Sequence, residues 1–171
     1  NLRCGTNILE TLTIKNAPLL SYLDCSLNRL KSLKLQNASS LSELSCGFNL
    51  LENLDLDSIP NLQYLACHGN TLTTLNLTNL NNLISLSCFQ NLIENLYFTN
   101  TKELTEIDCS GNNISSLDLS ELENLTYVDF RTNNIDQMIL GPSQDIWYLD
   151  GSENLITSFN VNHLDSLVFL L

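Results

Sequence analysis

Residues 62–77 read LQYLACHGNTLTTLNL and residues 83–98 read LISLSCFQNLIENLYF, with leucine, cysteine and asparagine at equivalent places. The two stretches lie 21 residues apart, and the same interval holds along the whole chain. The asparagines in this register are Asn7, Asn28, Asn49, Asn70, Asn91, Asn112, Asn133 and Asn154. All six cysteines stand three residues before an asparagine, as Cys4, Cys25, Cys46, Cys67, Cys88 and Cys109. So strict a period indicates one structural unit repeated in series.

The apolar positions of the unit follow the pattern L-x-x-L-x-C-x-x-N-x-L-x-x-L-x-L, followed by a polar stretch. L-x-C and L-x-L alternate with period two, so their apolar side chains point to one side of an extended strand. No stretch shows a sustained apolar stripe of helical period, and we expect essentially no helix. Strands of successive units should therefore lie parallel and about 4.8 Å apart, so that eight units form a rod of roughly 40 Å.

This pattern resembles the leucine-rich repeat, with cysteine in its third apolar slot, and the resemblance covers the whole chain. It resembles in particular the short 21-residue subclass with a nested half-repeat that is found largely in bacterial surface proteins. The resemblance implies a solenoid with a parallel sheet on its concave, first-strand face. It also implies shorter strands or extended segments on the opposite face. Phe130 and Gly151 depart from the pattern, because they replace cysteine in the seventh and eighth copies.

The asparagine and cysteine columns are best interpreted as scaffold. An inward asparagine offers one acceptor and two donors to turn backbone groups that would otherwise be buried without partners. The cysteines should act as small buried hydrophobes. Disulfides and zinc are weaker alternatives, because parallel Cβ vectors one coil apart hold Cβ atoms near 5 Å and offer no tetrahedral ligand set.

The periodicity assigns residues 1–171 to a single domain of eight coils and the start of a ninth, and we expect it to be part of a longer protein. The sequence contains no run of 18 apolar residues, so it predicts no membrane span. The formal net charge of −12 argues against binding of nucleic acid. This charge is uneven, with +3 over residues 1–42 and −15 over the remainder. The acidic part either keeps the protein soluble or faces a basic partner.

Catalytic motifs are missing from the sequence. The two histidines, His68 and His163, fall in different columns and would lie about 22 Å apart along the rod. They cannot share a catalytic site on this fold, and inward cysteines cannot reach them. Neither a phosphate-binding glycine loop nor a metal-ligand motif occurs, so we predict no enzyme activity, no cofactor and no metal.

One carboxylate cluster needs separate consideration. Asp108, Asp129 and Asp150 occupy the same outward position on three successive strands, where neighbouring carboxylates would lie about 5 Å apart. That spacing is close to the spacing in retaining glycosidases, but an open sheet face lacks the cleft that raises one pKa. Our interpretation is a solvated acidic face, with a bound cation such as calcium as the alternative.

The outward positions of the first strand carry the best candidates for function, because tyrosines stand there beside charged residues. Tyrosine and tryptophan contribute strongly to interfaces, although cross-strand packing of the rings explains them equally well. The candidate ligand-binding residues are Tyr22, Tyr64, Glu106, Asp108, Tyr127, Asp129, Arg131, Trp147, Tyr148 and Asp150. The opposite face bears mostly short polar residues and should be plain solvated surface.

The prediction from the sequence is a recognition module that binds a protein, with the main contact patch in the C-terminal half. A structural spacer and a carbohydrate-binding surface are the alternatives. The resemblance, and not the composition, implies an exported bacterial protein, located outside the cell or on its surface, with a role in adhesion or host contact.

Overall fold

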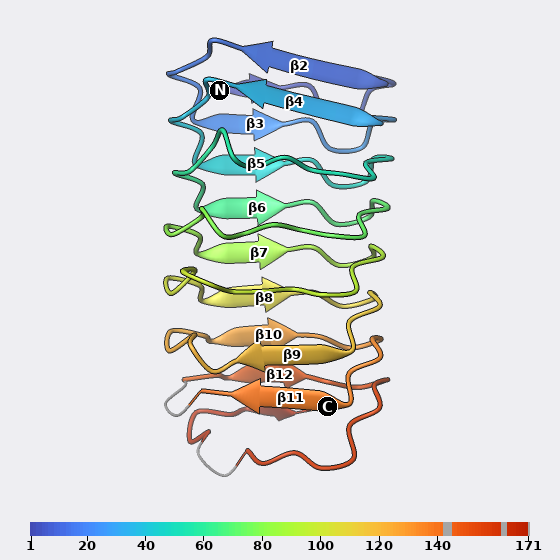
Figure 1. The fold of residues 1–171 in the computed structure, drawn as a ribbon, viewed down its shortest axis with the longest axis vertical. Coiled ribbons are helices and arrows are strands. Elements are labelled where there is room, and N and C mark those ends of the chain that lie inside the picture. The colour runs from blue at the N-terminus through green and yellow to red at the C-terminus, as the bar shows by residue number, and fades with distance from the viewer. Residues whose placement is uncertain (142–144, 162–163, 171) are drawn as a thin grey trace.

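The chain winds into a stack of short coils (Figure 1), and each coil corresponds to one 21-residue repeat. The computed structural model describes residues 1–141, 145–161 and 164–170. Coils are numbered here by their asparagine, from Asn7 in the first to Asn154 in the eighth. Within the described residues no helix forms, in agreement with the sequence prediction.

One parallel sheet runs the length of the stack and contains, among the described residues, nine strands of two or three residues. Each strand pairs in register with the strand 21 residues further on, as Leu44 does with Leu65. The strands are β1 (Leu2–Arg3), β3 (Tyr22–Asp24), β5 (Glu43–Ser45), β6 (Tyr64–Ala66), β7 (Ser85–Ser87), β8 (Glu106–Asp108), β10 (Tyr127–Asp129), β12 (Tyr148–Asp150) and β13 (Phe169–Leu170). The predicted first-strand sheet is thereby confirmed.

The opposite face differs in detail from its prediction. Its strands point the other way in Figure 1 and pair only near the two ends, as β2 (Thr11–Lys15) with β4 (Ser32–Gln36) and β9 (Ser116–Leu119) with β11 (Gln137–Leu140). With four or five residues, these strands are longer than those of the main sheet, not shorter. The middle coils have extended segments there, as the resemblance also allowed, joined by a single described bridge between Thr74 and Asn95.

The main-sheet strands are short because each coil turns immediately after the position of the cysteine column. The residue before the ladder asparagine has a positive φ in all eight coils, between 51° and 62°. Only Gly69 and Gly111 are glycines, and the other six residues are held in a conformation that costs an L-residue about 1 kcal/mol. The turns remain paired between coils, since the Phe48 amide donates to the His68 carbonyl at 2.8 Å.

The asparagine side chains hold these turns together. Asn70 Nδ2 lies 2.9 Å from the Cys67 carbonyl of its own coil and 3.1 Å from the Cys46 carbonyl of the coil before. Its Oδ1 accepts a hydrogen bond from the Leu51 amide at 2.9 Å. The bonds to the preceding coil recur in the coils that follow the first, as in Asn112. Each such asparagine therefore joins two coils and satisfies backbone groups that the stack buries.

The core consists of the stacked leucine columns and the cysteine column. Five cysteines are fully buried, while Cys4 in the first coil is partly exposed, and all six thiols are free. Burial raises the pKa of Cys67 to about 12, so the thiol stays protonated and behaves as an apolar group.

The two departures from the cysteine column compensate each other. Phe130 is fully buried, and its ring covers Gly151 so closely that a β-carbon at position 151 would collide with it. The pair Phe–Gly thus fills the space that two cysteines fill elsewhere. Because the core is densely packed, the large Phe130 ring requires the smallest residue at the same position of the next coil.

Candidate functional site

The outward side of the first-strand sheet carries all ten candidate binding residues, but it does not expose them equally. Trp147 and Tyr64 are 48% and 44% exposed, and Glu106 is also exposed. Tyr22, Asp108, Tyr127 and Tyr148 are partly buried. The side chain of Arg131 is 52% exposed. These residues come from β3, β6, β8, β10 and β12 and from the turns beside them.

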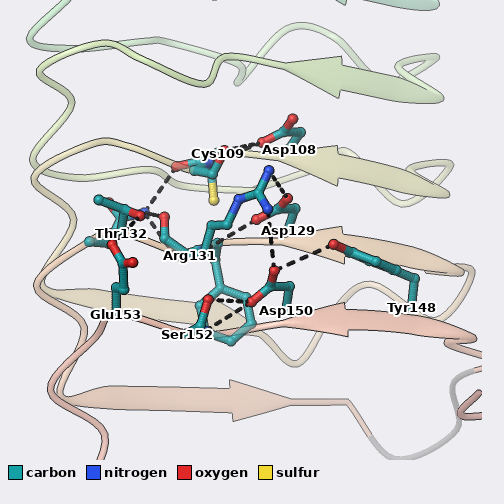
Figure 2. A network of polar contacts seen from close by, with 12 residues as sticks. Asp108, Cys109, Asp129, Arg131, Thr132, Tyr148, Asp150, Ser152 and Glu153 are labelled. Atoms are coloured by element: carbon teal, nitrogen blue, oxygen red, sulfur yellow. Dashed lines mark hydrogen bonds and ion pairs between the residues drawn. The ribbon is translucent and has the colours of Figure 1, made fainter. Parts of the chain in front are cut away.

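Asp129 and Asp150 contradict the prediction of a solvated acidic face, because each is only 1% exposed. Figure 2 shows the reason: the Arg131 side chain reaches across both carboxylates. Its guanidinium nitrogens lie 3.4 Å from Asp129 Oδ2 and 3.6 Å from Asp150 Oδ2. The positive charge that the aspartates need is supplied by the protein itself, in the place where a bound cation was considered.

The aspartates also have a local structural role that the sequence analysis missed. Asp150 Oδ1 accepts hydrogen bonds from the Ser152 amide at 3.0 Å and the Ser152 hydroxyl at 2.7 Å. Asp108 and Ser110 repeat this arrangement, and so do Asp24 and Ser26. An aspartate two residues before a serine stabilises the turn at the end of the strand. The sequence signal for it was the recurring D-x-S triplet, which is D-C-S at residues 24–26 and 108–110 and D-G-S at residues 150–152.

Asp129 is the exception, because Arg131 replaces the serine. Its Oδ1 accepts only the Arg131 amide at 3.2 Å, and within the described part of the chain its Oδ2 receives no hydrogen bond. Burial raises the pKa of Asp129 to about 6, against the opposing effect of the Arg131 amide, and the Asp108 charge adds to the rise. A raised carboxylate pKa is one requirement of a general acid. However, the buried position of Asp129 leaves a substrate no access to it.

The aromatic residues of the C-terminal half pack against one another. The rings of Tyr127 and Tyr148 are stacked, with centroids 4.4 Å apart and planes 8° apart. The Trp147 ring lies 5.9 Å from each of them. Burial and the nearby Asp129 charge raise the pKa of Tyr127 to about 12. We call Tyr127, Asp129, Arg131, Trp147, Tyr148 and Asp150 the Arg131 patch, a prepacked cluster with Trp147 and Arg131 at its surface.

A second aromatic cluster, which the sequence analysis did not identify, lies beside the strands of the third to fifth coils. The His68 ring stacks on Phe89 at 4.3 Å and meets the edge of Phe48 at 4.9 Å. Gly47 and Gly69 lie under the His68 and Phe48 rings, where a β-carbon would collide. Burial lowers the pKa of His68, so the imidazole is neutral at physiological pH. The sequence signal for this cluster was that two of its rings share a column with a glycine of a neighbouring coil, His68 with Gly47 and Phe48 with Gly69.

The remaining predictions concern His163, metal binding, membrane spans and the opposite face. His163 lies outside the described residues, so its separation from His68 stays a prediction. In the described ranges, no group of three or more His, Cys, Asp or Glu side chains is arranged to hold a metal ion. No helix in the same ranges is long and apolar enough to span a membrane. The opposite face is less plain than predicted, because Tyr97 is 68% exposed and lines a hollow of about 290 Å³.

The fold, the repeat and the asparagine ladder define a leucine-rich-repeat solenoid. Solved structures agree: the chain is similar to the functional domain of InlJ from Listeria monocytogenes, which includes a cysteine ladder. The likeness has a TM-score of 0.72 and 29% identity, and it covers 95% of this chain and 43% of that one. The chain thus has the repeat and the fold of a leucine-rich-repeat protein.

Two further structures share the fold. An internalin, inlF, from Listeria monocytogenes matches with a TM-score of 0.63 and 21% identity, over 82% of this chain and 54% of that chain. A leucine-rich-repeat protein from Leptospira interrogans matches with a TM-score of 0.53 and 16% identity, over 79% and 55%. This chain thus spans between two fifths and three fifths of each. No protein-family model matches the sequence, and no curated protein matches it significantly.

Proposed function

We propose that this chain is a protein-recognition module without catalytic activity, and that its first-strand sheet face is the contact surface. The observation that carries the proposal is the Arg131 patch. Trp147 and Arg131 stand about half exposed on a base of stacked tyrosines and buried aspartates. Tryptophan, tyrosine and arginine dominate the energetics of protein interfaces, and side chains already held in place lose little entropy on binding.

The buried aspartates have an indirect role in this proposal. Asp129 and Asp150 cannot contact a partner, but they fix the guanidinium of Arg131 from below. The contact residues in this half are therefore Trp147, Arg131 and the exposed edges of the two tyrosines. Tyr22, Tyr64 and Glu106 extend the surface toward the N-terminus.

We further propose that the module belongs to an exported bacterial surface protein with a role in adhesion or host contact. The similarity to the functional domain of InlJ over nearly the whole chain supports this location. Antibody labelling of intact cells of the source organism checks it. Labelling that appears only after the cells are broken would contradict export.

Binding to an array of extracellular protein ectodomains, with a glycan array in parallel, tests the recognition role. We expect Trp147→Ala and Arg131→Gln each to weaken binding to the captured ectodomain about tenfold or more. Tyr97→Ala is the matched control, since it removes an exposed ring from the opposite face. Binding to glycans alone would favour the carbohydrate alternative. Binding to neither array would favour a spacer, and equal binding by all variants would contradict the Arg131 patch as the contact surface.

A further inference from the structure

The N-terminal half of the first-strand face contains a hollow of about 240 Å³ that lies apart from the Arg131 patch. We call it the tyrosine hollow, and its main lining residues are Tyr22, Glu43, Ser45, Tyr64, Ala66 and Ser87. Its floor is made of small side chains on β5, β6 and β7, in register with one another. This volume is large enough for one long side chain.

The spacing of the two tyrosines keeps the hollow open. Tyr22 and Tyr64 are two coils apart with Glu43 in register between them, so their backbones are separated by about 9.6 Å. The residue in register between the two rings is Glu43, so the rings do not stack on each other and the space beside Glu43 stays open. Tyr127 and Tyr148 are only one coil apart, and their rings close the same space by stacking at 4.4 Å.

Carboxylates surround this floor of small side chains. Glu43 lies within the hollow, and Asp24 precedes Ser45 in the same column. At the other end Glu106 accepts a hydrogen bond from the Ser85 hydroxyl at 3.1 Å, with Asp108 on the same strand. The outward segments of these coils contain no lysine or arginine, namely residues 21–26, 42–47, 63–68, 84–89 and 105–110. The charged groups within these segments are therefore carboxylates, and the basic residue on the neighbouring strand is Arg3, in register with Asp24 at the border of the hollow.

We propose that the tyrosine hollow binds one lysine or arginine side chain of the partner protein. The aliphatic stem would lie over Ala66, and the cationic end would lie near Glu43 between the tyrosine rings. Long basic side chains bury their stems on apolar surface, and tyrosine faces attract cations. This inference rests on the proposed function and adds the chemistry of the partner.

The chain itself shows this contact at the border of the hollow. Arg3, on the neighbouring strand β1, places its guanidinium carbon 5.1 Å from the centroid of the Tyr22 ring. Arg3 occupies the N-terminal side of Tyr22, whereas the hollow lies on the C-terminal side, towards Glu43 and Tyr64. A tyrosine of this row therefore already receives a basic side chain, and the open side offers the same ring chemistry with a carboxylate next to it.

The test is an NMR titration of the chain with the acetylated and amidated peptides GGKGG, GGRGG and GGQGG, and with a norleucine peptide of the same length as the lysine peptide. We expect the two basic peptides to bind with a Kd in the millimolar range and to shift the amide signals of Ser45, Ala66 and Ser87. Binding of the norleucine peptide as tight as that of the lysine peptide would overturn the basic occupant.

Two variants separate the hollow from general attraction to an acidic surface. Glu43→Gln should weaken lysine-peptide binding about three- to fivefold, while Glu94→Gln, an exposed site outside the hollow, should not. Ala66→Phe fills the hollow without changing the charge and should abolish the shifts; a thermal melt confirms that it folds. Unchanged binding by Ala66→Phe would overturn the inference. Failure of every peptide to bind would also overturn the inference. The proposed function would still stand if the chain binds an ectodomain and the Trp147→Ala variant loses that binding.

Discussion

The two halves of the first-strand face use the same columns of the same repeat and arrive at opposite surfaces. In the second to fifth coils the tyrosines alternate with other residues, the floor consists of small side chains, and the outward segments contain no lysine or arginine. In the sixth to eighth coils the tyrosines are consecutive and stack, and Arg131 bridges two buried aspartates. One half leaves its tyrosine rings apart, whereas the other pairs its rings and carboxylates internally.

The difference shows how much a solenoid gains from spacing alone. Equivalent residues in adjacent coils lie about 4.8 Å apart, which is contact distance for rings and ion pairs, while a gap of one coil opens a slot. A residue in a leucine-rich repeat must therefore be read with its neighbours one period before and after.

The Phe130–Gly151 pair should be the most sensitive feature of the C-terminal half. Phe130→Cys restores the cysteine column but leaves a void above Gly151, and we expect a loss of about 2–4 kcal/mol in the free energy of unfolding. Gly151→Cys alone should cost about 1–3 kcal/mol through overpacking. Urea unfolding of both variants and the double variant measures the coupling.

The double variant Phe130→Cys/Gly151→Cys should recover stability to within about 1 kcal/mol of the wild type, because two cysteines fill the same space in the regular coils. The control, Cys67→Ala in the N-terminal half, should lose about 1 kcal/mol, since it removes one small group. Additive losses in the double variant would show that the two positions are independent.

Arg131→Ala removes the cation from two buried carboxylates. Because the guanidinium is half exposed, we expect a moderate loss of about 1–3 kcal/mol at pH 7. The loss should shrink toward pH 4, where Asp129 is protonated. Arg29→Ala, an exposed arginine in the other half, is the control and should cost less than about 0.5 kcal/mol. A loss for Arg131→Ala that is independent of pH would contradict a role in charge compensation.

Asp129→Asn should stabilise the protein at neutral pH. The folded-state pKa of Asp129, about 6, is above its ordinary value of 3.8, so folding favours the protonated form. Its contribution to stability is fully present below pH 3.8 and is lost as the pH rises through 6. The neutral amide should gain about 1–2 kcal/mol at pH 7 and flatten the stability profile between pH 4 and 6. A variant less stable than the wild type at pH 7 would contradict this sign.

The fold was predictable from the sequence because the repeat itself encodes it. The leucine columns, Cys67 in the core and Asn70 at the turn follow from period two within a strand and period 21 along the chain. The positive φ before each asparagine was hidden, because only two of the eight residues are glycines. At the other six positions the asparagine hydrogen bonds impose a positive φ on residues that disfavour this backbone conformation.

The site was less predictable, because its geometry depends on side-chain reach. The sequence predicted an outward position for Asp129 and Asp150 but could not show that Arg131, two residues after Asp129, would reach across both carboxylates. It also treated His68 as an isolated residue, although Phe89 follows it at the same position of the next coil. The position of a residue in the repeat predicts which side of the sheet it faces, whereas its burial depends on the length of the neighbouring side chains.

Tyr148→Ala and Tyr64→Ala compare the two halves directly with the same substitution. Tyr148 loses a stacked ring, worth about 0.5–1.5 kcal/mol, whereas Tyr64 lies between Glu43 and Ser85 in register and should lose less than about 0.5 kcal/mol. Thermal unfolding of both variants measures this difference. Equal losses would mean that the rings contribute only through strand propensity, and the contrast between an open and a closed half would then have no energetic basis.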